Sequence, residues 1–178
     1  IQEEAGEDAL LLSGAGEGDI NEPLRETYAA RVRWLIANLF TALVASSVIA
    51  VVDGALQQMI ALAILMPIVA SIGGNAGTQT MAVAVRALAT NQLTRSNTLR
   101  TIRREITVAL MNGATIATLL GLAAGLYFGN VQLGMVIGSA IVINVLVAGL
   151  SGVLVPVALE RLNQDPAVAS SVFVTMVT

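Results

Sequence analysis

The 178-residue sequence contains no cysteine, no histidine and no lysine. These absences exclude disulfides, thiol nucleophiles, histidine bases, the usual zinc ligands and a phosphate loop that ends in lysine. Proteolysis within a membrane would need a serine with a partner base or a pair of aspartates, and the sequence offers neither. We therefore expect no enzyme. A metal bound here would be held by oxygen atoms, which suit hard cations such as magnesium, calcium or manganese.

Charged residues are also scarce, at 12% of the chain, whereas apolar residues make up 56%. A chain with this many apolar residues is not expected to face water over most of its surface. We therefore predict an integral membrane protein surrounded by a lipid bilayer. The net charge of -3 does not describe the whole chain, because acidic residues cluster within residues 1–26. Beyond Glu26 the chain is slightly basic.

Composition divides the chain into three parts. Residues 1–23 are acidic, contain several glycines and show no apolar period, which predicts a tail or the remnant of a linker. The first residue is isoleucine and no basic segment precedes an apolar core, so we expect a fragment or a processed chain without a signal peptide. Residues 24–33 predict a short interfacial connecting helix that leads to Trp34, a typical aromatic anchor. Residues 34–178 predict a transmembrane domain.

The apolar runs predict an all-α helical bundle of five transmembrane spans. A span needs about 20 apolar residues, and the fifth run, from Pro166 to Thr178, is shorter than that and is expected to be truncated. The second run contains Pro67 and a glycine cluster at 73–77, which predict a helix that is broken or kinked at mid-membrane. The four complete runs are Trp34–Val52, Leu56–Val85, Ile106–Phe128 and Leu133–Leu159.

Arginine placement predicts the orientation. Arginines flank the first span, fill the polar stretch Arg86–Glu105 and follow the fourth span at Arg161. The intervening turns at 53–54 and 129–132 carry none. Because positive residues concentrate in cytoplasmic loops, we expect a multi-pass protein of the cell membrane with a cytoplasmic N-terminus.

The segment from Pro67 to Gln79 is the strongest candidate for a functional site. Gly73 and Gly77 have the spacing that lets helices approach closely, so packing alone is one reading. The polar residues between and after them, above all Asn75, favour a second reading. Proline frees a backbone carbonyl, and carbonyl and amide oxygens together make a site for a hard cation. Irregular backbone at membrane depth is tolerated where it lines a wet cavity, which indicates an ion pathway.

Three motifs carry a resemblance to a known family. The strings PIVASIGGNAGTQ, INVLVAGLSGVLVP and NQDPAVASSVFVTMVT begin at residues 67, 143 and 163. In this order and spacing they resemble the transmembrane domain of the MgtE family of magnesium channels and transporters. The resemblance implies a homodimeric pore with five spans per subunit that passes magnesium inward. Residues 1–33 would correspond to the tail of the family's cytosolic domains and to the connecting helix.

The resemblance also assigns roles to residues. It implies that Asn75 lines the central ion site and that the backbone carbonyl of Ser71, one turn earlier, faces the ion. Asp53 corresponds to an acidic residue, usually glutamate, that attracts cations at the outer ends of the first two spans. Further pore-lining candidates are Gly74, Ser171 and Thr175.

The family's decisive ligand is an aspartate in the fifth span, in a pattern similar to TTxTD. Here the sequence reads Thr175-Met176-Val177-Thr178. The acidic residue would be the next one. Met176 departs from the threonine usual at its position.

Other polar residues in the spans have simpler readings. The amides of Asn112 and Asn144 are expected to form interhelical hydrogen bonds, and Glu105 is expected to be an interfacial ion pair or a solvated charge. Glycines at four-residue intervals in the third and fourth spans indicate close packing or a dimer contact. These are Gly121, Gly125, Gly129, Gly134 and Gly138.

The sequence thus predicts potential-driven magnesium uptake through a dimeric pore, with no nucleic-acid partner. Transport of another divalent cation, such as cobalt or manganese, is an alternative. A non-conducting helix-packing subunit is a second one, which the polar break in span two disfavours. An organic-solute transporter would be expected to show charged or aromatic contacts at the midplane. Three phenylalanines, two tyrosines and one tryptophan make an aromatic platform a poor expectation.

Overall fold

The computed structural model describes residues 23–51, 60–94 and 96–178, and over these residues it contains helices and no strand. This confirms the all-α prediction. Within these ranges four helices are long and apolar enough to cross a membrane, and the fifth is short. The helices are α2 (Leu24–Ala50), α4 (Ile60–Ala89), α5 (Thr98–Tyr127), α6 (Val131–Arg161) and α7 (Pro166–Val177).

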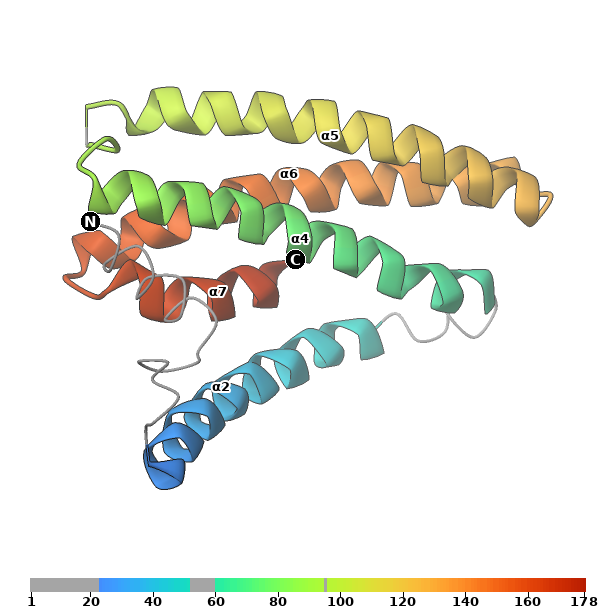
Figure 1. The fold of residues 1–178 in the computed structure, drawn as a ribbon. Coiled ribbons are helices and arrows are strands. Elements are labelled where there is room, and N and C mark those ends of the chain that lie inside the picture. The colour runs from blue at the N-terminus through green and yellow to red at the C-terminus, as the bar shows by residue number, and fades with distance from the viewer. Residues whose placement is uncertain (1–22, 52–59, 95) are drawn as a thin grey trace.

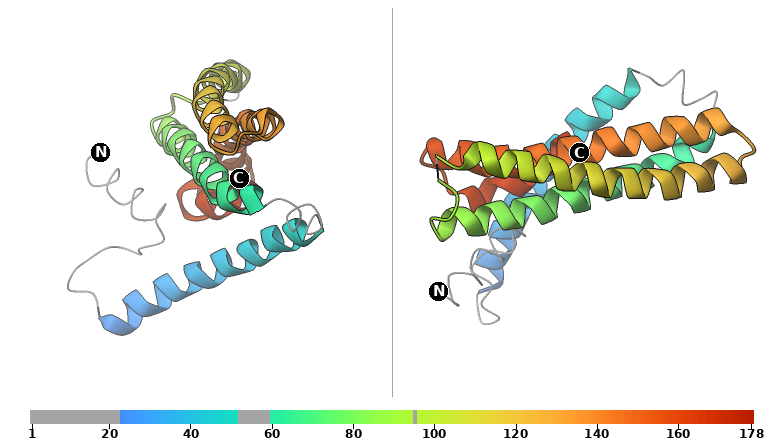
Figure 2. Two further views of the ribbon diagram at one scale, coloured as in Figure 1. Left: turned by 90° about the vertical axis from the view of Figure 1, so that its right-hand side faces the viewer. Right: turned by 90° about the horizontal axis from the view of Figure 1, so that it is seen from above.

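Helix α6 lies at the centre of the bundle and contacts α4, α5 and α7. Helices α4, α5 and α6 run nearly side by side, and α7 lies against α4 and α6 (Figures 1 and 2). Helix α2 contacts α7 and is inclined away from the other long helices (Figure 1). The chain therefore forms a packed group of four helices with α2 attached at its side.

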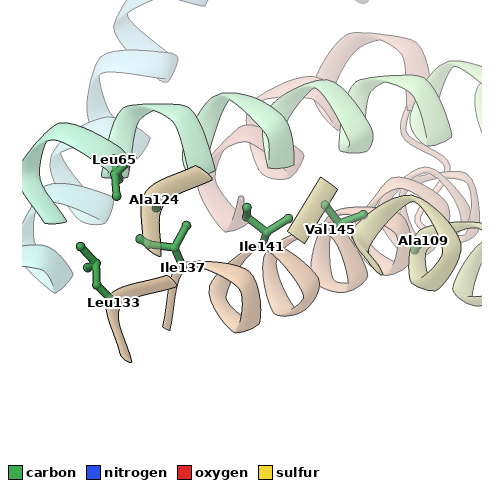
Figure 3. Packing of buried hydrophobic residues seen from close by; sticks show 7 residues of the cluster. All are labelled: Leu65, Ala109, Ala124, Leu133, Ile137, Ile141 and Val145. Carbon is green, nitrogen blue, oxygen red and sulfur yellow. The ribbon is translucent and has the colours of Figure 1, made fainter. Parts of the chain in front are cut away.

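The main core lies between α4, α5 and α6. Figure 3 shows Leu65 of α4 facing the row of α6 side chains that begins at Leu133 and Ile137. Ile141 is fully buried in that row. The buried members of this cluster are Leu65, Ala109, Ala124, Leu133, Ile137, Ile141 and Val145.

Glycines bring α5 and α6 into close contact. A Cβ atom placed on Gly134 would lie 2.5 Å from the carbonyl oxygen of Gly121 and 3.1 Å from the Cα of Gly125. A Cβ on Gly138 would lie 3.4 Å from the carbonyl oxygen of Ala117. Because a larger side chain would separate the two backbones, the predicted close packing is confirmed within one chain for Gly121, Gly125, Gly134 and Gly138. Gly129 meets nothing within 4 Å and belongs to the turn after α5.

The second span was expected to be broken or kinked at mid-membrane, and the structure shows no break in it. Helix α4 continues without interruption through Pro67 and through the glycine cluster. Proline has no backbone N–H, so Pro67 cannot donate to the carbonyl four residues earlier. Only this one hydrogen bond of the helix is lost, and the other backbone bonds can form on both sides of it. Gly73 and Gly77 keep helical conformation and serve as contact points for neighbouring helices.

Two other boundaries differ from the hydropathy pattern. The polar stretch Arg86–Glu105 was expected to be a loop, but only residues 90–97 lie between α4 and α5. Arginine stems are long enough to bring their charge to water while the helix backbone continues. The proposed interfacial helix at 24–33 and the first span form one continuous helix, α2, so no helix end marks their division at Trp34.

Asparagine residues in left-handed conformation follow the ends of α4 and α6. Asn91 and Asn163 both have a φ of 54°, and the next residue in each case donates its N–H to a carbonyl five residues back. These two ends lie on the same side of the bundle (Figure 1). The turn between α5 and α6, with Gly129 at φ 62° and the Asn130 side chain capping α6, lies at the opposite side.

Candidate ion-pathway site

Residues 73–77 of α4, the glycine segment, have one face that packs against other helices. Gly73 and Gly77 are buried. A Cβ on Gly73 would overlap the side-chain amide of Asn144, and a Cβ on Gly77 would lie 2.5 Å from Cγ1 of Val174. One face of the segment is therefore filled by α6 and α7, as the packing reading predicts.

Asn144 makes the interhelical hydrogen bond that was expected of it. Its Nδ2 donates to the carbonyl oxygen of Val69 on α4, at 2.8 Å. The amide can approach this carbonyl because Gly73, one turn later, has no side chain in the way. The bond fixes α4 to α6 two residues after Pro67.

A second face of the same segment is polar and open. Ser71, Asn75 and Gln79 are exposed, at intervals of four residues along α4. Thr78 is also exposed, and its hydroxyl donates to the carbonyl oxygen of Gly74 at 2.8 Å. Packing and polarity are thus properties of two faces of one helix, and the two readings of this segment are compatible.

Gly74 differs from its two glycine neighbours. A Cβ built at this position would meet nothing within 4 Å, so its backbone borders open space rather than another helix. Ser71, Gly74 and Asn75, three of the predicted site residues, lie within five consecutive positions of α4. Their roles toward an ion remain predictions.

The end of α7 lies beside this segment. Val174 is buried against Gly77 and Met81, and Cγ2 of Thr178 lies 3.6 Å from the position of a Gly77 Cβ. On the same helix Thr175 is exposed and Ser171 is half-buried. The structure therefore brings the α7 motif next to the segment of α4 that holds Gly73-Gly74-Asn75, the GGN motif. Asp53, the remaining predicted site residue, lies outside the described residues.

One polar contact was missed by sequence reasoning. The hydroxyl of Thr80 on α4 donates to Oε2 of Glu105 on α5 at 3.3 Å. Glu105 was expected to pair with a neighbouring arginine or to be solvated, but its recorded partner belongs to another helix. The signal was the carboxylate itself, directly before the apolar run of α5, because ionisable residues at membrane depth are rare and usually face a partner or a cavity.

The comparisons with known proteins agree with these motifs. The MgtE family profile, described as a divalent cation transporter, matches residues 66–178. A magnesium transporter MgtE of Bacillus subtilis is 34% identical over 97% of this chain and 38% of its own length. That of Enterococcus faecalis is 35% identical over 98% of this chain and 39% of its length. That of Thermus thermophilus is 36% identical over 81% and 32%.

The chain therefore spans 32–39% of the length of these relatives. The family profile covers α4 from Met66 onward and all of α5, α6 and α7, which includes the glycine segment, Asn75 and the α7 motif. From this match the chain belongs to the MgtE family.

Proposed function

We propose that this chain forms the membrane part of a divalent-cation uptake pathway, with magnesium as the ion, and that two copies meet along the polar face of α4. The observation that carries the proposal is the exposure of Ser71, Asn75 and Gln79 in the middle of a 30-residue apolar helix. Hydrocarbon has no hydrogen-bonding partner for such groups, so they need protein or water beside them.

A second copy supplies that cover. In a two-fold dimer each subunit presents the same surface, so the Asn75 face of one chain meets the Asn75 face of the other. A pathway between them would be lined by amide and hydroxyl oxygens and, at Gly74, by open backbone. Magnesium releases its waters reluctantly, and such oxygens suit an ion that passes partly hydrated.

The membrane potential supplies the driving force. Two charges that cross 100 mV gain roughly 4.6 kcal/mol, or about three decades in equilibrium ratio. Uptake therefore needs no ATP. Asn75 offers a neutral oxygen, which orients a hydrated ion but does not offset the loss of solvation by itself. The acidic residue expected after Thr178 would supply that attraction, because Thr178 lies beside the α4 segment at Gly77.

The relatives' names support magnesium as the transported ion. The broader family description and the oxygen-only ligand set keep cobalt and manganese as the second candidates. Uptake of the four ions magnesium, cobalt, manganese and calcium, measured one at a time at a fixed potential, decides between them.

The first test replaces Asn75. In the intact transporter, reconstituted in vesicles at a set potential, Asn75→Leu is expected to reduce magnesium uptake sharply, because an apolar group replaces an ion-facing oxygen. Asn38→Leu is the matched control, since it makes the same change within α2. If Asn75→Leu transports at the wild-type rate while it inserts normally, Asn75 has only a packing role.

The second test concerns orientation. We propose that the protein lies in the cell membrane with its N-terminus in the cytoplasm. The arginine-bearing ends of α4 and α6 share one side of the bundle, and positive residues favour the cytoplasmic side (Figure 1). Gln132→Cys is then expected to react with an impermeant thiol reagent from outside, and Ser96→Cys only from inside. Both residues are exposed. The reverse pattern would invert the topology.

A further inference from the structure

A pocket with several polar groups in a partly apolar wall lies within the single chain, where α4, α5 and α6 meet. Its volume is about 220 Å³, and α5 contributes Glu105 and Asn112 to its lining while α4 contributes Gln79 and Thr80. Small residues of the three helices, among them Gly149 of α6, complete the wall. A Cβ on Gly149 would lie 3.1 Å from Cβ of Ala109, so a larger residue at either position would crowd the wall of the pocket.

Glu105 is the acidic member of the lining. It is half-buried, and its carboxylate accepts a hydrogen bond from Thr80 across the helix interface. The other polar groups, the amides of Gln79 and Asn112, carry carbonyl oxygens that accept hydrogen bonds. A carboxylate with neutral oxygens around it is the donor set that hard cations and their bound waters prefer.

The pocket has room for a hydrated cation. A cavity needs about 10–15 Å³ of such space for each water, so the six waters of an octahedral magnesium fit within its volume of about 220 Å³. The described residues contain no group of three acidic side chains that could hold a bare ion. From these observations we propose that the pocket binds a hydrated divalent cation through water, with Glu105 as the charged contact.

Arg104 also lines the pocket, and it is exposed. Its positive charge opposes a dication, while Glu105 attracts one. The two residues, although adjacent in sequence, therefore have opposite effects on cation binding. Removing the charge of Glu105 is therefore expected to weaken cation binding, and removing the charge of Arg104 is expected to strengthen it.

The site rests on the proposed function for the identity of the cation. It shares Gln79 with the proposed interface between copies, whereas Thr80, Glu105 and Asn112 belong to the pocket alone. It is an open pocket between helices of one subunit, and it includes Glu105 in the first third of α5. A cation held here would stand on the cytoplasmic side of the Asn75 face in the proposed orientation. It would therefore occupy a second binding site, distinct from the central site at Asn75.

The experiment uses thiol protection in the intact transporter in vesicles. Val108, in the pocket wall, and Leu110, on another side of α5, have nearly equal exposed fractions of 41% and 45%. We expect a water-soluble thiol reagent to label Val108→Cys and not Leu110→Cys, because the pocket is wet and Leu110 faces lipid. Magnesium is expected to slow the labelling of Val108→Cys.

Three second-site changes then identify the contacts. Glu105→Gln is expected to raise the magnesium concentration that protects Val108→Cys by about tenfold, and Arg104→Gln to lower it. An unchanged labelling rate without magnesium shows that each variant is folded. Asn75→Leu is expected to leave the protection intact, even though it blocks transport.

Each contrary result overturns the site. Labelling of Val108→Cys that magnesium does not slow shows that no cation binds here. Protection that survives Glu105→Gln unchanged removes the charged contact, and protection lost in Asn75→Leu shows that the pocket is not separate. Wild-type transport by Asn75→Leu, by contrast, contradicts the proposed function and leaves the pocket standing if protection depends on Glu105.

Discussion

Helices α6 and α2 are both long and apolar, with 31 and 27 residues, yet they differ in what covers them. Half of the most apolar window of α6 is buried within the chain, against 6% of that of α2. Helix α6 contains four glycines, each in contact with a neighbouring helix, and α2 contains none. Hydrophobicity predicts which segments enter a membrane, whereas small residues decide which of them pack together there.

The largest expected difference between these helices comes from enlarging a small residue. Gly134→Leu in α6 should destabilise the bundle by about 3 kcal/mol, because the added side chain meets backbone of α5 rather than a movable side chain. Ala42→Leu in α2, at an exposed position, should change stability by less than about 0.5 kcal/mol. Unfolding in a denaturing-detergent titration measures both. Equal stability of the two variants would break the comparison.

A smaller difference is expected from removing an amide. Asn144→Ala loses the hydrogen bond to Val69 and the contact with Gly73, and should cost about 1 kcal/mol. Asn38→Ala in α2 should cost less than about 0.5 kcal/mol. The same titration applies. A cost for Asn38→Ala as large as that for Asn144→Ala would show that α2 is held by contacts beyond those of the single chain.

The smallest effects are expected at threonines that bond their own helix. The Thr78 hydroxyl donates to Gly74 and that of Thr41 in α2 donates to Asn38, so Thr→Val at either position should change stability by less than about 0.5 kcal/mol. Magnesium uptake, by contrast, should differ between the two variants. Thr78→Val is expected to lower magnesium uptake, because it makes the polar face of α4 apolar, while Thr41→Val is not. Equal uptake by both variants would exclude Thr78 from the pathway.

Much of this fold follows from the sequence because its signals are local. The apolar runs give the long helices, and Gly129 with Asn130 gives the turn between α5 and α6. Helix ends were predicted less well, since Arg86 and Arg100 lie within helices although hydropathy placed them in a loop. Left-handed Asn91 and Asn163 mark the true ends of α4 and α6, and hydropathy does not register backbone conformation.

The candidate site was predictable in part. The GGN motif identified the segment of α4, but not that Gly73 and Gly77 pack while Gly74 borders open space. Which way a glycine faces depends on the phase of its helix relative to the neighbours. The contact between Thr80 and Glu105 joins residues 25 positions apart, and no local pattern encodes such a pairing.

The side attachment of α2 has a mechanical consequence. Within the chain α2 meets the bundle chiefly at α7, and α7 in turn touches the glycine segment of α4 through Val174 and Gly77. Helix α7 thus lies between α2 and α4, and it also contacts α6. A tilt of α2 acts on α7 first, while Asn144 holds α4 against α6. A tilt of α2 is therefore expected to reach the packing face of α4, at Gly77, through the short fifth helix.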